Sequence, residues 1–183
     1  ITDTPAYETT ESLHGVWELI WELDNGHRIK SVTGYREWDQ AEWNDVDTYP
    51  GDFIKGGLTH DMKQFTQEIQ LISPSGNDLE YVLGLFYFDM DLDEQTILEG
   101  CTDVCHLLLG LSDPLFLRTT WTSGVKVENM AAFGHLTYSF SEQLKGFFGA
   151  RILREEIDVT GQQSGTFFFW ATGDLPEYKV DNS

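Results

Sequence analysis

The chain is poor in cysteine, in basic residues and in long apolar runs. Of its 183 residues, 2 are cysteine and 11 are lysine or arginine, against 31 aspartates and glutamates. Two cysteines are too few for the disulfide framework of a small secreted domain. A formal net charge of −20 disfavours phosphate-bearing partners, so we expect neither nucleic acid nor a membrane as a partner. No run reaches the roughly 20 apolar residues of a membrane-spanning helix.

Sequence motifs that would name a chemistry are also absent. The chain has no Gly-x-Ser-x-Gly, no phosphate-binding loop and no His-Glu-x-x-His. Cys101, Cys105 and His106 lack the second ligand pair of a structural zinc site. We therefore expect reduced structural thiols, no metal and no cofactor.

An acidic stretch resembles the start of a calcium-binding loop. Asp89, Asp91 and Asp93 occupy positions 1, 3 and 5 of such a loop. Glu94 then stands where the loop needs glycine, and Gly100 where it needs glutamate. The stretch is more typical of a solvated acidic turn that follows a strand.

The chain does have many hydrophobic residues (40%), and they alternate with polar ones. Trp17, Leu19 and Trp21 recur at every second position, which is the pattern of a half-buried strand. We expect both tryptophans to be buried on one face of that strand. Similar patterns, separated by turn signals such as Asp24-Asn25-Gly26 and "SPSGND" at 73–78, predict strands at 16–23, 28–35, 65–72, 79–88, 115–122, 125–133, 135–140, 150–158 and 165–172.

Three segments do not fit the strand pattern. Residues 1–12 are polar and predict a flexible N-terminal arm before a single domain at 13–183. Residues 36–64 lack periodicity and predict a long loop, with Gly56-Gly57 as its hinge. Residues 92–110 carry apolar side chains three and four apart, which predicts one short helix. The expected fold is all-β, an antiparallel β-barrel of about eight strands.

Gly15-Val16-Trp17 at the start of the first predicted strand resembles the Gly-x-Trp signature of the lipocalins and the wider calycin barrels. In that family the tryptophan closes one barrel end beneath an arginine, whose place Arg151 or Arg154 would take. The segments "LKGFFGARILREEI" and "SGTFFFWATG" are similar to the strand pair that ends the small barrels of allene oxide cyclases. Both resemblances imply a small apolar ligand inside a barrel, and neither transfers a catalytic residue.

The candidate catalytic groups are polar side chains on predicted strands and a histidine in the predicted 36–64 loop. They are Tyr87, Arg118, His60 and His135, of which His60 has Asp61 beside it in the chain. The alternatives are that Arg118 and Arg154 pair with acidic residues, that His60-Asp61 belongs to a solvated turn and that His135 is structural. Aromatic residues spread over several strands are the candidate ligand-binding residues: Trp21, Tyr35, Trp38, Trp43, Tyr81, Trp121, Phe168 and Trp170.

Three functions fit these features. The preferred one is a cofactor-independent isomerase, cyclase or lyase that binds a small apolar or aromatic molecule inside the barrel, with the 36–64 loop as its lid. The alternatives are a non-catalytic carrier and a carbohydrate-binding module. Homo-oligomers are left open. The expected location is the cytoplasm, although a chain that begins at Ile1 would not display a removed signal peptide.

Overall fold

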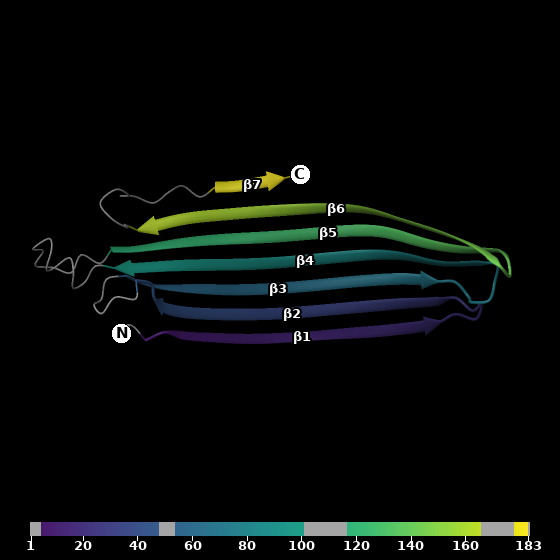
Figure 1. The fold of residues 1–183 in the computed structure, drawn as a ribbon, viewed down its shortest axis with the longest axis horizontal. Coiled ribbons are helices and arrows are strands. Elements are labelled where there is room, and N and C mark those ends of the chain that lie inside the picture. The colour runs from purple at the N-terminus through teal and green to yellow at the C-terminus, as the bar shows by residue number, and fades with distance from the viewer. Residues whose placement is uncertain (1–4, 48–53, 101–116, 166–177, 183) are drawn as a thin grey trace, which may run out of the picture.

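The computed structural model describes residues 5–47, 54–100, 117–165 and 178–182. All regular elements in these ranges are antiparallel strands that follow one another across a single sheet in chain order (Figure 1). Six strands are long and a seventh is short: β1 (Tyr7–Glu22), β2 (Arg28–Asp45), β3 (Ile54–Ile72), β4 (Leu79–Gly100), β5 (Leu117–Ser141), β6 (Leu144–Gly165) and β7 (Tyr178–Asn182). The prediction of an all-β antiparallel fold is therefore confirmed.

The long strands far exceed the usual strand length. They contain 16 to 25 residues, whereas strands of globular proteins usually have about 3–10. At about 3.3 Å per residue, the 22 residues of β4 extend over roughly 70 Å. Such strands reach well beyond the width of an ordinary domain core.

The two ends of the sheet differ in how the strands are connected. At one end, which we call the turn end, short segments 23–27, 73–78 and 142–143 join the strands. At the other end, the connections 46–53, 101–116 and 166–177 are longer (Figure 1). The sheet is thus a series of tight hairpins that all turn on the same side.

Two of these tight turns were predicted from the sequence and are confirmed. In the first, the Leu23 N–H donates to the His27 carbonyl at 2.8 Å, and Gly26 has φ of 79°. In the second, Gly76 has φ of 86°. Only glycine adopts this left-handed conformation without a steric cost, so these two glycines fix where the strands reverse.

The register divides the side chains between two faces. Odd-numbered residues of β1 to β4 lie on the same face as even-numbered residues of β5 and β6. We call this face A, and the opposite one face B. Along β3, Asp61, Lys63, Phe65 and Ile69 of face A are exposed, whereas the face B residues between them are half-buried. On β3, side chains are therefore more crowded on face B than on face A.

The described residues form one layer without a second layer to cover it. Ala131 is the one hydrophobic residue among them that is buried. Trp17 and Trp21 are 66% and 67% exposed, so the prediction that both are buried is wrong. Their alternation did identify a strand with one apolar face, but no other element of the described chain packs on that face.

The predicted loop and helix are replaced by strands. The predicted loop 36–64 is wrong, because β2 continues to Asp45 and β3 starts at Ile54. The predicted helix is wrong over 92–100, which is the end of β4, and its remainder lies outside the described residues. The predicted acidic turn at Asp89 is also strand. Residues 7–12 of the predicted arm pair with β2.

The predicted number of about eight strands differs from the seven strands of the described residues for a physical reason. Three predicted segments, 115–122 (described from residue 117), 125–133 and 135–140, fall within the one strand β5. Gly124 and Gly134 lie between these segments, and both keep cross-strand partners in the ladders with β4 and β6. Within the described residues β1 and β7 are the outer strands of the sheet, each paired on one side.

Candidate functional site

Face A carries a continuous apolar area near the turn end, which we call the apolar band. No charged residue lies within it, and the next face A position toward the long connections is charged on all six long strands. These limiting residues are Glu11, Glu37, Lys63, Asp89, Glu128 and Arg154. The band comprises Leu13, Gly15, Trp17, Leu19, Trp21, Ile29, Ser31, Thr33, Tyr35, Phe65, Gln67, Ile69, Leu71, Leu79, Tyr81, Leu83, Leu85, Tyr87, Met130, Ala132, Gly134, Leu136, Tyr138, Gly146, Phe148, Ala150 and Ile152.

The band covers a similar length of each long strand. It covers seven residues on β2, from Ile29 to Tyr35, and nine on β4, from Leu79 to Tyr87. At about 3.3 Å per residue these lengths are roughly 23 and 30 Å. Many of its side chains are exposed, among them Leu85 at 63% and Ile152 at 79%. Such a large exposed apolar area usually marks a contact surface.

The three polar side chains within the band satisfy one another. The Thr33 hydroxyl donates to Gln67 Oε1 at 2.6 Å, and the Gln67 amide donates to Ser31 Oγ at 2.9 Å. The three residues come from β2 and β3, where the register places Thr33 beside Gln67. Polar groups paired in this way cost little when water is removed from around them.

Aromatic residues line the edge of the band toward the long connections. Tyr35 and Phe65 are cross-strand partners, and the Phe65 and Tyr87 rings lie 6.3 Å apart. The Tyr35 hydroxyl donates to Glu37 at 3.4 Å, and the Tyr87 hydroxyl donates to Asp89 at 3.5 Å. Both tyrosines therefore keep their rings with the band and direct their hydroxyls toward the charged residues beyond it.

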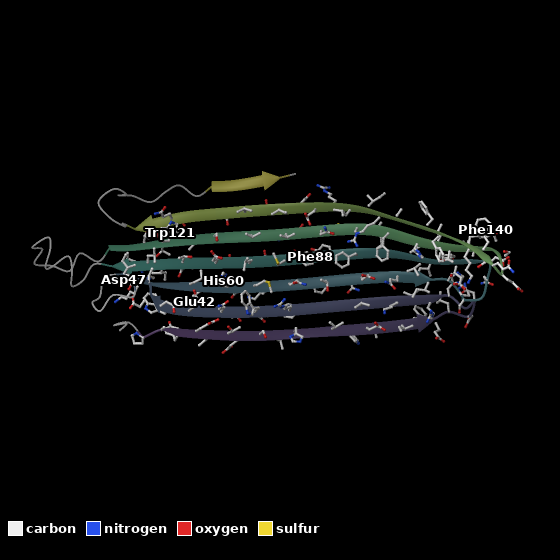
Figure 2. All side chains as sticks on the ribbon, viewed as in Figure 1. Glu42, Asp47, His60, Phe88, Trp121 and Phe140 are labelled. Carbon is white, nitrogen blue, oxygen red and sulfur yellow. The ribbon has the colours of Figure 1, made fainter. Side chains whose placement is uncertain are left out.

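Aromatic residues also occur at the turn end of the band. Tyr81 places its hydroxyl 2.8 Å from His27 Nε2 in the first turn. Tyr138 packs edge-on against Phe140, with ring centroids 4.8 Å apart. Phe140 marks the turn end in Figure 2. Tyrosine hydroxyls at the two edges thus point in opposite directions, each away from the apolar band.

Beyond the band, face A is acidic. Asp39, Asp61 and Asp93 are successive cross-strand partners on β2, β3 and β4. Burial raises the pKa of Asp39, and the nearby Asp61 and Glu37 raise it further. The same two acids raise the pKa of Lys63, Asp61 having the larger effect, and Lys63 lies 3.7 Å from each of them.

Near the turn end, the opposite face carries the charges that the band lacks. Lys30 and Glu18 on face B form an ion pair at 2.7 Å. The Arg151 guanidinium lies over the Phe86 ring, 5.4 Å from its centroid. At this level the sheet is apolar on face A and mixed polar on face B.

The four candidate catalytic residues divide between the two faces. Tyr87 and Arg118 lie on face A, whereas His60 and His135 lie on face B. Arg118 pairs with Glu99 of β4, which is twelve residues along that strand from Tyr87. On face B, His60 pairs with Glu94 and His135 with Val82, which are also twelve residues apart along β4. Twelve residues correspond to roughly 40 Å. The structure therefore brings none of the four together.

His60 does have close neighbours, but they differ from the predicted one. Its ring stacks on Trp38, with centroids 5.6 Å apart, and its Nδ1 lies 3.3 Å from Glu94. Asp61, the neighbour in the chain, points to face A because side chains alternate along a strand.

The arginines form the ion pairs that the sequence left as the alternative. Arg118 lies 3.4 Å from Glu99, and Arg154 pairs with Glu156.

The candidate ligand-binding aromatics are also divided. Face A carries Trp21, Tyr35, Trp43 and Tyr81, and face B carries Trp38 and Trp121. Phe168 and Trp170 lie outside the described residues, as do Cys101, Cys105 and His106. Three of the six placed residues, Trp21, Tyr35 and Tyr81, belong to the apolar band.

Face A carries hollows in both of its halves. One lies in the apolar band, has a volume of about 570 Å³ and is lined by residues such as Ile69, Leu85 and Ile152. Another, of about 690 Å³, lies in the acidic half among Asp39, Asp61 and Asp93. Of the residues that line the first hollow, the sequence selected Tyr87 as a candidate and missed Ile69, Leu85 and Ile152. Their signal was present in "LGLFY", where leucines 83 and 85 share the parity of Tyr87.

Among the described residues, no group of three or more His, Cys, Asp or Glu could hold a metal ion. In the described part of the chain there is also no helix long and apolar enough to cross a membrane. Comparison with protein-family models and with curated proteins found no match.

Proposed function

We propose that the sheet is part of the wall of a closed antiparallel β-barrel whose apolar band contacts the hydrocarbon of a lipid bilayer. The band is the observation that carries this proposal. At the strand tilt of about 35–45° found in transmembrane barrels, its stretches of seven to nine residues rise roughly 16–25 Å, which approaches the outward apolar band of about 25 Å in such barrels. A membrane-spanning strand needs about 9–11 residues, and every long strand exceeds that length.

The distribution of polar groups supports the same proposal. Charges border the band on all six strands, and the polar residues inside it are hydrogen-bonded to each other. In a bilayer an unsatisfied polar group is costly, whereas Ser31, Thr33 and Gln67 satisfy one another. Tyrosine rings at the band edges, with hydroxyls directed outward, match the aromatic girdles found at membrane interfaces.

The negative net charge led to the expectation of no membrane partner. The acidic residues of face A, however, lie beyond the band, between it and the long connections. An acidic half of this kind is placed in water when the band lies in lipid. It is repelled by anionic headgroups, so zwitterionic lipid is the appropriate partner for a test.

A second candidate function is the binding of a small apolar molecule, which the sequence predicted. The 570 Å³ hollow supports it, because small-molecule sites usually measure about 300–1,000 Å³. This hollow lies on exposed face A, where an acyl chain of a lipid is an occupant of suitable chemistry. The isomerase, cyclase or lyase reactions stay predictions, since the candidate catalytic residues do not converge.

The proposal is tested by diluting the urea-unfolded chain into phosphatidylcholine vesicles. We expect the chain to float with the vesicles, to resist extraction at alkaline pH and to acquire a β-sheet circular dichroism spectrum. The band variant Leu83→Asn/Leu85→Asn should lose insertion. The matched control, Asp91→Asn/Asp93→Asn on the same strand and face, should keep it. A chain that stays in the aqueous fraction, or two variants that insert equally, would contradict the proposal.

A further inference from the structure

The free edge of β1 is the feature that leads beyond the proposed wall. The Leu23 N–H donates to the His27 carbonyl, so the pair 23–27 is a hydrogen-bonded pair. In antiparallel sheets such pairs alternate with non-hydrogen-bonded ones, and the β1–β2 register is continuous. Odd-numbered residues of β1 therefore bond to β2, and even-numbered ones direct their N–H and C=O groups to the free edge.

A membrane cannot leave that edge unpaired. His14, Val16, Glu18 and Ile20 alternate with the band residues of β1, so their edge groups lie at the depth of the band. Each unsatisfied backbone group costs several kcal/mol in hydrocarbon, which is why sheets in membranes close on themselves. The β1 edge must then pair with another strand.

The direction of the outer strands limits what that strand is. β1 and β7 both run from the long-connection end toward the turn end (Figure 1). Direct pairing of β7 with β1 would therefore be parallel, within one chain or between copies in the same orientation. Antiparallel pairing of β1 with β1 of a second copy needs one copy turned end to end, which places the two acidic halves on opposite sides of the bilayer.

From these constraints we infer that the β1 edge docks an antiparallel strand from a different polypeptide. That polypeptide supplies an odd number of strands to the wall. A second copy of the described sheet does not fit. The docked strand carries apolar side chains opposite Leu13 to Trp21 and polar ones on face B. This inference rests on the proposed barrel wall, because only closure requires the edge to be filled.

Residue-resolved hydrogen exchange of the full chain in zwitterionic micelles tests the inference. The probe is a synthetic peptide with the sequence of residues 28–45, which already pairs antiparallel with β1 on its other side. We expect the even-numbered amides of β1 to exchange rapidly in the chain alone and to gain at least about tenfold protection with the peptide. The odd-numbered amides should be protected in both samples.

A matched pair of variants identifies the edge as the binding site. Val16→Pro removes one outward N–H and should weaken peptide binding about tenfold, as expected for one lost hydrogen bond. Val16→Thr keeps the N–H and the branched shape and should bind as the parent does. If Val16→Pro does not fold, Ser12→Pro removes another outward N–H near the strand start.

Three outcomes overturn the inference. Protection of even-numbered amides in the chain alone, with a discrete oligomer in native mass spectrometry, means that copies fill the edge. The same protection in a monomer means that the chain closes by itself. Unchanged exchange after peptide addition means that the edge does not dock a strand. These results come from micelles, so they are independent of whether the chain inserts into vesicles.

Discussion

A single arginine in the middle of the apolar band should reveal what the band contacts. Leu85 lies on β4, is 63% exposed and lines the apolar hollow. At the midplane of a bilayer, arginine on the lipid face of a barrel costs about 2–4 kcal/mol. At an exposed site in water, the same change costs within about 0.5 kcal/mol. The first value lowers the folding equilibrium constant roughly 30- to 700-fold, and the second about twofold.

The assay is reversible unfolding by guanidinium chloride in phosphatidylcholine vesicles, followed by tryptophan fluorescence. Leu85→Arg is compared with Gln95→Arg, which places the same side chain on the same strand and face but in the acidic half. We expect a loss of about 2–4 kcal/mol for the first variant. The second should be within about 0.5 kcal/mol of the parent, since that half of face A is in water.

Equal, small effects of both substitutions would refute the reasoning. They would mean that the Leu85 side chain contacts water and not lipid. A large loss of stability for both variants would mean that arginine disturbs the sheet itself. That result would contradict the placement of the edge of the apolar band at Asp89.

Three further predictions concern packing, hydrogen bonding and pH. Gly84→Ala should cost about 1–3 kcal/mol in chemical unfolding, because its Cβ would come 2.2 Å from the Phe133 ring. Gly15→Ala meets nothing within 4 Å and should be neutral or stabilising. Gln67→Leu and Thr33→Val should each destabilise by about 1 kcal/mol, and the double variant should cost less than their sum, because both partners are then apolar. A strictly additive double-mutant cycle would exclude the hydrogen bond between Thr33 and Gln67 as a source of stability. Burial and neighbouring acids raise the pKa of Asp39, so folding gains stability as pH falls through that raised pKa. Asp39→Asn should remove this gain, and an unchanged pH dependence of the unfolding midpoint between about pH 7 and 4 would contradict it.

The sequence predicted the local features of the fold better than its overall form. The turns at Gly26 and Gly76 were predicted because an αL conformation there selects glycine. The alternation around Trp17 and Trp21 predicted the β1 strand and its apolar face. Neither signal states what covers that face, so burial in a core was assumed and proved wrong.

The errors at 54–64 and 92–100 have a common cause. In the long-connection half, the apolar residues of β3 and β4 lie mainly on face B, for example Leu58, Met62 and Leu92. In the turn half the apolar band lies on face A. Along β3 and β4 the apolar side chains therefore change parity midway. That change interrupts the period-2 pattern by which strands are predicted from sequence.

The candidate site was predicted only in part for a related reason. Tyr35 and Tyr81 were selected as ligand-facing aromatics, and both lie in the band. Of the residues selected for chemistry, Tyr87 lies at the edge of the band and Arg118 in the opposite half of face A, whereas His60 and His135 belong to face B. The absence of charge from one parity over nine residues of β4 was the stronger signal.

Spin labels placed one at a time along β4 report which positions of the strand contact lipid. Labels at positions 79–95, in a Cys101→Ser/Cys105→Ser background in phosphatidylcholine vesicles, are measured for contact with oxygen and with a water-soluble nickel chelate. The account predicts high oxygen contact at odd positions from 79 to 87, low oxygen contact at the even positions between them, and a change to nickel contact at odd positions from 91 onward. Odd positions 79–87 that contact the nickel chelate as freely as positions 91–95 would contradict it.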